Sequence, residues 1–109
     1  MITVVIKNTK QGAIVRISGH APRQADGRDY NMACACVSSI AFSAYNTFRR
    51  MHGRGEILEC KLEDRPGDMY MNLKARRDHL RDVRCHIDML RTGLLMVKEQ
   101  FPGSIRFVG

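Results

Sequence analysis

The chain has 109 residues, of which 44% are hydrophobic and 27% charged, and these are the length and composition of one small globular domain. No apolar run approaches the roughly 20 residues that a membrane-spanning helix needs, and the first residues lack the basic segment and long apolar stretch of a signal peptide. The sequence therefore predicts no membrane-spanning helix, and we expect a single cytoplasmic domain over residues 1–109.

The balance of charges is strongly basic. Eighteen lysines and arginines against eleven acidic residues give a net charge of +7. Such an excess is typical of proteins that associate with nucleic acid or the ribosome, but it also arises where basic side chains only solvate helix faces. Charge alone favours the second interpretation.

Two β-branched stretches open the chain. Ile2–Lys7 predicts a first strand, Gln11-Gly12 a turn, and Ala13–Ser18 the second strand of a hairpin. The second strand would deliver Gly19-His20 to an end of the sheet. A structural hydrogen bond at a strand end is the alternative to a catalytic role for this histidine.

The next segment, Pro22–Tyr30, has no apolar periodicity and contains proline, glycine, arginine and aspartate, so it predicts a surface loop. Loops beside a functional site often serve as lids, and Gly27 would offer this one a hinge. A connector without a functional role is the alternative.

Apolar residues at helical spacing predict a first long helix from Ala33 to about Met51, with a buried stripe of Ala33, Val37, Ile40, Ala44 and Phe48. Cys34 then lies in the first turn, where unpaired backbone N–H groups favour negative charge. Ser38 lies one turn further on the same face, either to help position a thiolate or substrate or to pack the helix on the sheet. Cys36 points about 200° away around the helix.

A histidine at a strand end, a loop and a cysteine at a helix start form the arrangement that a Cys–His nucleophile needs. The thiolate attacks, the histidine takes its proton and later returns it to the leaving amine, and N–H groups at the helix start stabilise the oxyanion. His20 and Cys34 are therefore candidate catalytic residues. On spacing alone, an inert buried cysteine is the more common outcome.

The second half of the chain repeats the order of the first. Ile57–Glu63 and Met69–Lys74 alternate apolar and polar residues around the turn Arg65–Asp68, which predicts a second hairpin. A second helix follows from Asp78 to about Phe101, and Pro102-Gly103 end it.

The apolar stripe of this second helix is the strongest periodic signal in the chain: Leu80, Val83, Ile87, Leu90, Leu94, Val97 and Phe101. Met89 and Met96 widen the stripe, which indicates burial on more than one side or a subunit contact. Ser104–Val108 predicts a last short strand. The order ββαββαβ predicts an α+β fold in which two helices pack on a mostly antiparallel five-stranded sheet.

The four cysteines are Cys34, Cys36, Cys60 and Cys85. In a cytoplasmic chain we expect reduced thiols in place of disulfides. A zinc site could include His79 or His86, but Cys34-x-Cys36 lacks the two-residue spacing of a zinc knuckle. We therefore expect neither a metal nor an organic cofactor.

Two segments, Gly19-His20-Ala21 and Cys34-Ala35-x-x-Ser38, resemble the ribosomal-processing cysteine proteases of bacteria, the Prp family. The similarity covers most of the chain, including Phe42, Asn46 and the closing helix and strand. It implies a single cysteine-protease domain over residues 1–109, with His20 as acid/base and Cys34 as nucleophile. It also implies a homodimer that removes the N-terminal extension of a large-subunit ribosomal protein without a cofactor. We expect no membrane partner, and any contact with nucleic acid only by way of the ribosome.

The loop before the cysteine departs from the family pattern, which has Asp-x-x-Cys. Here Asn31 lies three residues before Cys34 and Asp29 five residues before it. Either could orient the site, although we prefer Asn31 as the cap of the helix. Because ribosomal proteins are usually basic, as this chain is, charge does not favour such a substrate as a whole. Recognition would then use acidic or apolar parts of the extension or a local acidic groove, and Asp26 and Asp29 are candidates to face the peptide.

Two other functions fit parts of the sequence. A small basic RNA- or ribosome-binding module without catalysis would place arginines on phosphates, namely Arg49, Arg50, Arg76, Arg77 and Arg81. The chain lacks the Gly-x-x-Gly clamp and the aromatic strands of such modules. A thiol redox role would use Cys34 and Cys36, but these point apart on the helix, so a disulfide between them would be strained.

Overall fold

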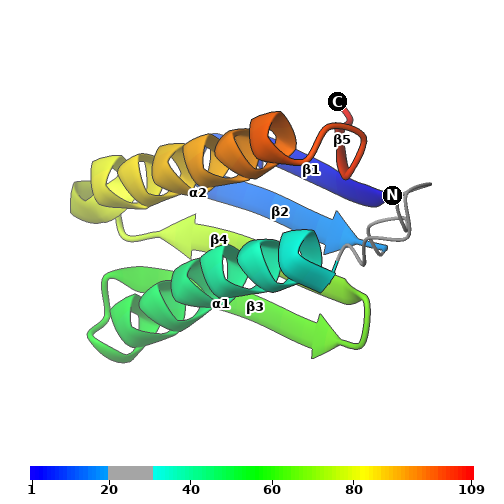
Figure 1. Ribbon diagram of the computed structural model, residues 1–109. Helices are drawn as coiled ribbons and strands as arrows, with labels where there is room; N and C mark the ends of the chain where they lie inside the picture. The colour runs from blue at the N-terminus through cyan, green and yellow to red at the C-terminus, as the bar shows by residue number, and fades with distance from the viewer. Residues whose placement is uncertain (20–30) are drawn as a thin grey trace.

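The computed structural model describes residues 1–19 and 31–109 (Figure 1). The elements follow the predicted order, with a short 3₁₀ helix added before the second long helix. They are β1 (Ile2–Asn8), β2 (Gly12–Ser18), α1 (Asn31–Gly53), β3 (Ile57–Arg65), β4 (Asp68–Ala75), η1 (Arg77–His79), α2 (Leu80–Gln100) and β5 (Ile105–Phe107). His20 and the predicted loop Pro22–Tyr30, with Asp26, Gly27 and Asp29, lie outside the described residues.

The five strands form one sheet in the order β3-β4-β2-β1-β5. β1 pairs with β2, β2 with β4 and β3 with β4 in antiparallel fashion, whereas β5 runs parallel to β1. The predicted mostly antiparallel sheet is confirmed, and the parallel pair arises because α2 carries the chain back across the sheet before β5 begins. Pairing of β2 with β4 sets Ser18 opposite Asp68, so the end of β2 meets the β3–β4 turn.

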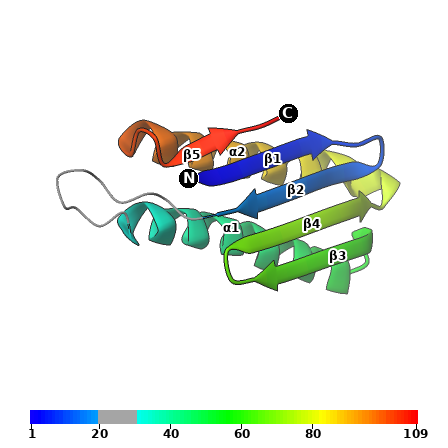
Figure 2. The same ribbon diagram turned by 90° about the vertical axis from the view of Figure 1, so that its right-hand side faces the viewer.

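Both long helices lie on one face of the sheet, α1 over β3 and α2 over β2 (Figures 1 and 2). The core lies between these two layers. It buries Ala33, Val37 and Phe48 from α1, as the periodicity predicts. It also buries most of the α2 stripe, namely Val83, Ile87, Leu90, Leu94 and Val97. Among the described helices, none is both long and apolar enough to cross a membrane.

Both long helices differ slightly from their predicted bounds. α1 begins at Asn31, before the apolar repeat that starts at Ala33. α2 begins at Leu80, after Asp78, because the chain first makes the tighter turn of η1. Helix ends commonly differ by one or two residues from the bounds of an apolar pattern. Cys34 keeps its predicted place in the first turn of α1.

Three large apolar side chains of β3 and α2 are exposed, and of these Leu58 was predicted to lie on a buried face. Leu58 is 55% exposed, because a register shift between Ile57 and Glu59 interrupts the alternation of β3. Met89 and Met96 are 75% and 64% exposed on α2. An apolar surface of this kind on one helix is available for a partner.

Candidate active site

Cys34 lies within the first turn of α1, which begins at Asn31. The first backbone N–H groups of a helix have no acceptor within it, and they point out of the helix end. Together with the helix dipole, such groups can stabilise the oxyanion of a tetrahedral intermediate formed beside this position. The Cys34 side chain is half-buried, so it is both accessible and held by its surroundings.

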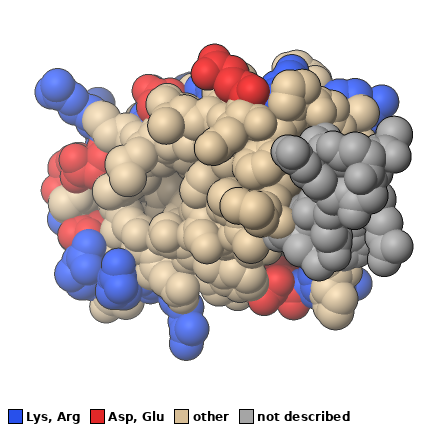
Figure 3. Space-filling view, in the orientation of Figure 1, with Lys and Arg blue, Asp and Glu red and all other residues tan. Residues whose placement is uncertain are grey.

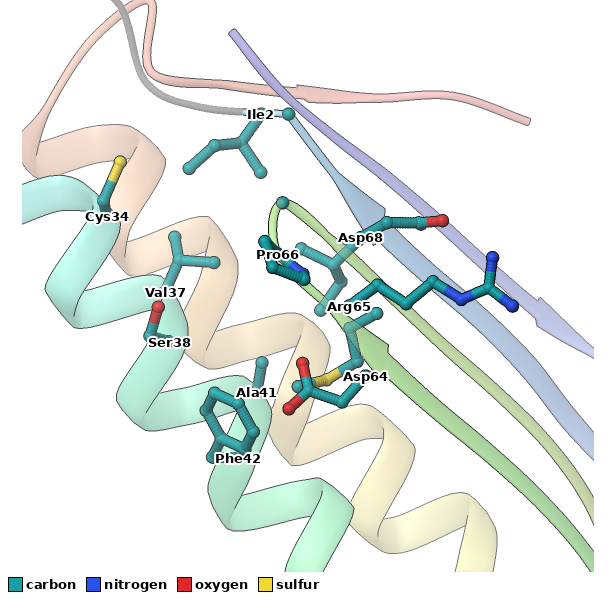
Figure 4. Close-up of a pocket in the computed structure, with 14 residues that line it drawn as sticks. Ile2, Cys34, Val37, Ser38, Ala41, Phe42, Asp64, Arg65, Pro66 and Asp68 are labelled. Carbon is teal, nitrogen blue, oxygen red and sulfur yellow. The ribbon is translucent and has the colours of Figure 1, made fainter.

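A pocket of about 360 Å³ opens beside Cys34 (Figure 4). Three separate parts of the chain form its walls: one side of α1, the β3–β4 turn and the ends of the first hairpin. The lining residues are Cys34, Val37, Ser38, Ala41 and Phe42 from α1, residues 64–69 from the turn, and Ile2, Ile17 and Gly19 from the hairpin. The pocket is of a size to take side chains of a peptide, because small-ligand sites begin at about 300 Å³.

Gly19 holds the end of β2 against this pocket. Its N–H donates a hydrogen bond of 2.9 Å to the carbonyl of Gly67 in the β3–β4 turn. Its φ is +94°, and a Cβ atom there would lie only 2.5 Å from the carbonyl oxygen of Met1. The position therefore requires glycine, and the chain that continues to His20 starts from the wall of the Cys34 pocket.

Replacing Gly19 by alanine should destabilise the fold more than the same change at Gly55. Both glycines have positive φ, +94° and +76°, which costs an alanine about 1–2 kcal/mol. Only at Gly19 would the new Cβ also meet backbone, since nothing lies within 4 Å of one at Gly55. Urea unfolding of both variants measures the difference, and equal losses of stability would contradict the close contact with Met1.

The three other cysteines lie elsewhere. Cys36 is half-buried and packs against the core, whereas Cys85 is exposed on α2. Cys60 is half-buried in β3, and this burial raises the pKa of its thiol, so less of it is ionised at neutral pH. No disulfide joins cysteines of the described chain, and of the four, Cys34 is the one that lines the pocket.

Ser38 and Phe42 follow Cys34 at intervals of one helical turn and line the same pocket, so the predicted shared face of Cys34 and Ser38 is confirmed. The orienting residue is not decided: Asp29 is outside the described residues, and so is the side chain of Asn31. Their roles, and that of Asn31 as helix cap, stay predictions.

The β3–β4 turn is the part of the site that sequence reasoning missed. Residues Arg65–Asp68 predict a turn, but nothing in the pattern indicates that this turn faces Cys34. Asp68 is held by Arg16, whose Nε and Nη2 donate to its carboxylate at 3.2 and 3.3 Å. Asp64 is exposed at the rim of the pocket, close to Phe42 in Figure 4.

The arginines proposed for RNA lie away from this pocket. Arg49 and Arg50 are near the end of α1, and Arg76, Arg77 and Arg81 are around the start of α2, which lies at the same end of the molecule (Figure 1).

Acidic partners alternate with basic side chains at this end of the molecule. The Arg76 Nε lies 2.7 Å from Asp78, and Arg54 Nη2 lies 2.7 Å from Glu56. The Arg54 guanidinium thereby holds the pKa of the Glu56 carboxyl below its ordinary value. Of the five arginines considered for RNA, Arg76 therefore has its charge paired with an acidic side chain.

A zinc site would need several ligand side chains close together. Within residues 1–19 and 31–109, no group of three or more His, Cys, Asp or Glu side chains comes together as metal ligands would.

A family model described as cysteine protease Prp matches residues 1–106 of the chain. No curated protein sequence gives a significant match.

Several solved structures share the fold. The ribosomal processing protease Prp of S. aureus, in complex with a covalently linked product peptide, superposes with a TM-score of 0.70 at 19% identity, covering 98% of this chain and 97% of that one. The same protease with a substrate peptide gives 0.70 at 18% identity, over 99% and 98%. SMU.848 from Streptococcus mutans gives 0.63 at 18% identity, over 98% and 95%.

Proposed function

Because the chain belongs to the cysteine protease Prp family, it is a cysteine protease, and we propose that it removes the N-terminal extension of a bacterial large-subunit ribosomal protein in the cytoplasm. One observation carries the assignment of its site. Cys34 lies at the start of α1 beside a pocket, and the wall of that pocket includes Gly19, the residue immediately before His20. The S. aureus protease with this fold holds a covalently linked product peptide in one structure and a substrate peptide in another.

In the proposed mechanism, the Cys34 sulfur attacks the carbonyl carbon of the scissile peptide bond while His20 takes the thiol proton. Backbone N–H groups at the start of α1 stabilise the oxyanion of the tetrahedral intermediate. The intermediate collapses to a thioester, and His20 gives its proton to the leaving amine. Water then attacks the thioester with His20 as base, which releases the carboxylate product and restores the thiol.

The pocket walls indicate what the peptide presents near the scissile bond. Val37, Ala41 and Phe42 of α1 and Ile17 and Met69 of the sheet offer an apolar surface, which favours an apolar side chain.

The charged residues that line this pocket are Asp64, Arg65 and Asp68, and Asp68 is paired with Arg16. We propose that the exposed Asp64 carboxylate favours a basic residue further along the peptide. This agrees with a substrate taken from a ribosomal protein, since such proteins are usually basic, and Asp26 and Asp29 are proposed to act in the same way.

The decisive test is to incubate the purified protein with a ribosomal protein that carries its extension and to follow the products by mass spectrometry. We expect one cut, at the junction between extension and mature chain. An intact substrate after long incubation, or cuts scattered along the chain, would contradict the proposed function. Tight RNA binding without cleavage would favour the non-catalytic alternative.

We also propose that the protein is a homodimer joined through its helical face. Figure 3 shows that the middle of this face carries no charged side chains and is hollowed. The hollow, of about 500 Å³, lies between α1 and α2, with small residues such as Ala44 and Gly93 in its lining and Met89 and Met96 at its border. Two copies could bury these methionines in each other's groove.

Sedimentation velocity tests the dimer. The wild-type chain should sediment as a dimer and Met96→Glu as a monomer, because a buried carboxylate in an apolar contact is costly. Val108→Glu, which adds a charge at a 44% exposed valine away from the groove, should leave the dimer intact. A wild-type chain that sediments as a monomer would refute the proposal.

A further inference from the structure

We propose that the substrate peptide binds as an added β-strand along the free edge of β3 and continues from there into the Cys34 pocket. This inference rests on the proposed peptidase function and deepens it, because it assigns the surface that holds the peptide on one side of the scissile bond.

The two edges of the sheet differ in length. β3 has nine residues and β5 only three. In the described part of the chain, β3 pairs with β4 on one side and with no strand on the other. A long unpaired edge is a ready template for an extended peptide, because main-chain groups supply the affinity whatever the side chains are.

The register identifies which β3 residues would meet the peptide. β3 and β4 are joined by the two-residue turn Pro66-Gly67, so Arg65 and Asp68 face each other at its base. In a two-residue hairpin this pair is hydrogen-bonded, and from there pairs alternate along the ladder. Residues 61, 63 and 65 therefore direct their N–H and C=O groups to β4, whereas residues 60, 62 and 64 direct theirs outwards.

One flank of α1 lies above this edge. Cys34, Ser38, Phe42 and Tyr45 follow one another at helical spacing, and the first three share the pocket with Asp64 at the end of β3 (Figure 4). The rings of Phe42 and Tyr45 meet edge to face with centroids 6.1 Å apart, and Phe42 is 38% exposed. An added strand would lay alternate side chains against this aromatic flank.

The edge also leads directly to the nucleophile. Asp64 and Arg65 end β3 and line the Cys34 pocket, so a strand that pairs with residues 60–64 is already aligned with it. Holding the peptide extended on one side of the scissile bond helps to fix the position of the carbonyl that the sulfur must reach.

Features at the Ile57 end of β3 limit the pairing of an added strand to residues 60–64. The register shift between Ile57 and Glu59 breaks the regular edge, and the exposed Glu59 places a charge at the shift. Bulges and charges are the means by which edge strands avoid pairing with copies of themselves. The regular edge is therefore left for residues 60–64, next to the pocket.

A scan of N-methylated peptides tests the proposal. The probe is a synthetic peptide that spans the extension and the first residues of the mature ribosomal protein, and its affinity for the Cys34→Ala variant is measured by calorimetry. N-methylation removes one backbone hydrogen-bond donor of the peptide and adds bulk toward β3. Peptides methylated at every second position should therefore bind about tenfold more weakly or worse, whereas peptides methylated at the intervening positions should bind nearly as well as the unmodified peptide.

Amide hydrogen exchange followed by NMR supplies an independent readout. The peptide should slow exchange at Cys60, Leu62 and Asp64, whose N–H groups face outwards, and change Lys61 and Glu63 little. Strand addition would be overturned if the loss of affinity did not alternate between successive methylated positions, or if the peptide did not slow amide exchange in β3. Wild-type enzyme that still cleaves the same peptide would then show that the peptidase function survives, whereas no cleavage would mean that the function itself fails.

Discussion

Replacing Cys34 by alanine is expected to reduce cleavage of the extension by about 10⁴-fold or more, because none of the other three cysteines lines the pocket where the thioester would form. The variant should fold normally, since the change removes a single atom from a half-buried side chain at a helix start. Mass spectrometry of the products measures the loss, and trapping of the wild-type acyl-enzyme with a slow substrate identifies the modified cysteine.

The chain offers matched controls for this result. Cys36→Ala changes a cysteine two residues away that packs against the core, and Cys85→Ala changes an exposed one on α2. Both should keep activity close to that of the wild type. If Cys34→Ala still cleaves while Cys36→Ala does not, the nucleophile is wrongly assigned, and the helix start would no longer explain the chemistry.

The helices and most strands of this fold can be predicted from the sequence, because each buries one face over several turns or alternations. The α2 stripe from Val83 to Val97 is buried as its spacing requires, and so are Met69, Met71 and Leu73 of β4. Leu58 was wrongly predicted to be buried, because a register shift depends on how two strands fit together and leaves no mark in a local pattern.

The candidate site could be predicted only in part. Cys34 is found from the sequence because the start of a helix is a local feature. The β3–β4 turn could not be assigned to the site, because its place there depends on which strands are neighbours. Once β2 pairs with β4, Ser18 faces Asp68, and Gly19 reaches Gly67 through a 2.9 Å hydrogen bond. This pairing joins segments almost 50 residues apart, and no local periodicity encodes it.

Replacing His20 by alanine is expected to lower kcat/KM by about 10²- to 10⁴-fold, which is the usual contribution of a general acid and base. The thiol would lose the group that takes its proton, and the amine the group that protonates it. Raising the pH should recover part of the first loss, because a more alkaline solution removes the thiol proton directly, but it should not recover the second. Rates of peptide cleavage measured across pH separate the two contributions.

Alkylation of Cys34 by iodoacetamide gives a second readout that needs no substrate. If His20 accepts the thiol proton, His20→Ala should slow this alkylation at neutral pH, whereas His52→Ala, at an exposed histidine near the opposite end of α1, should not. The alkylation rate of Cys85 in the same sample is the control for the reactivity of iodoacetamide itself, because that thiol is exposed and distant in sequence from the site. A His20→Ala variant that is alkylated and cleaves as fast as wild type would mean that another group accepts the proton of the Cys34 thiol. His20 would then have a structural role only.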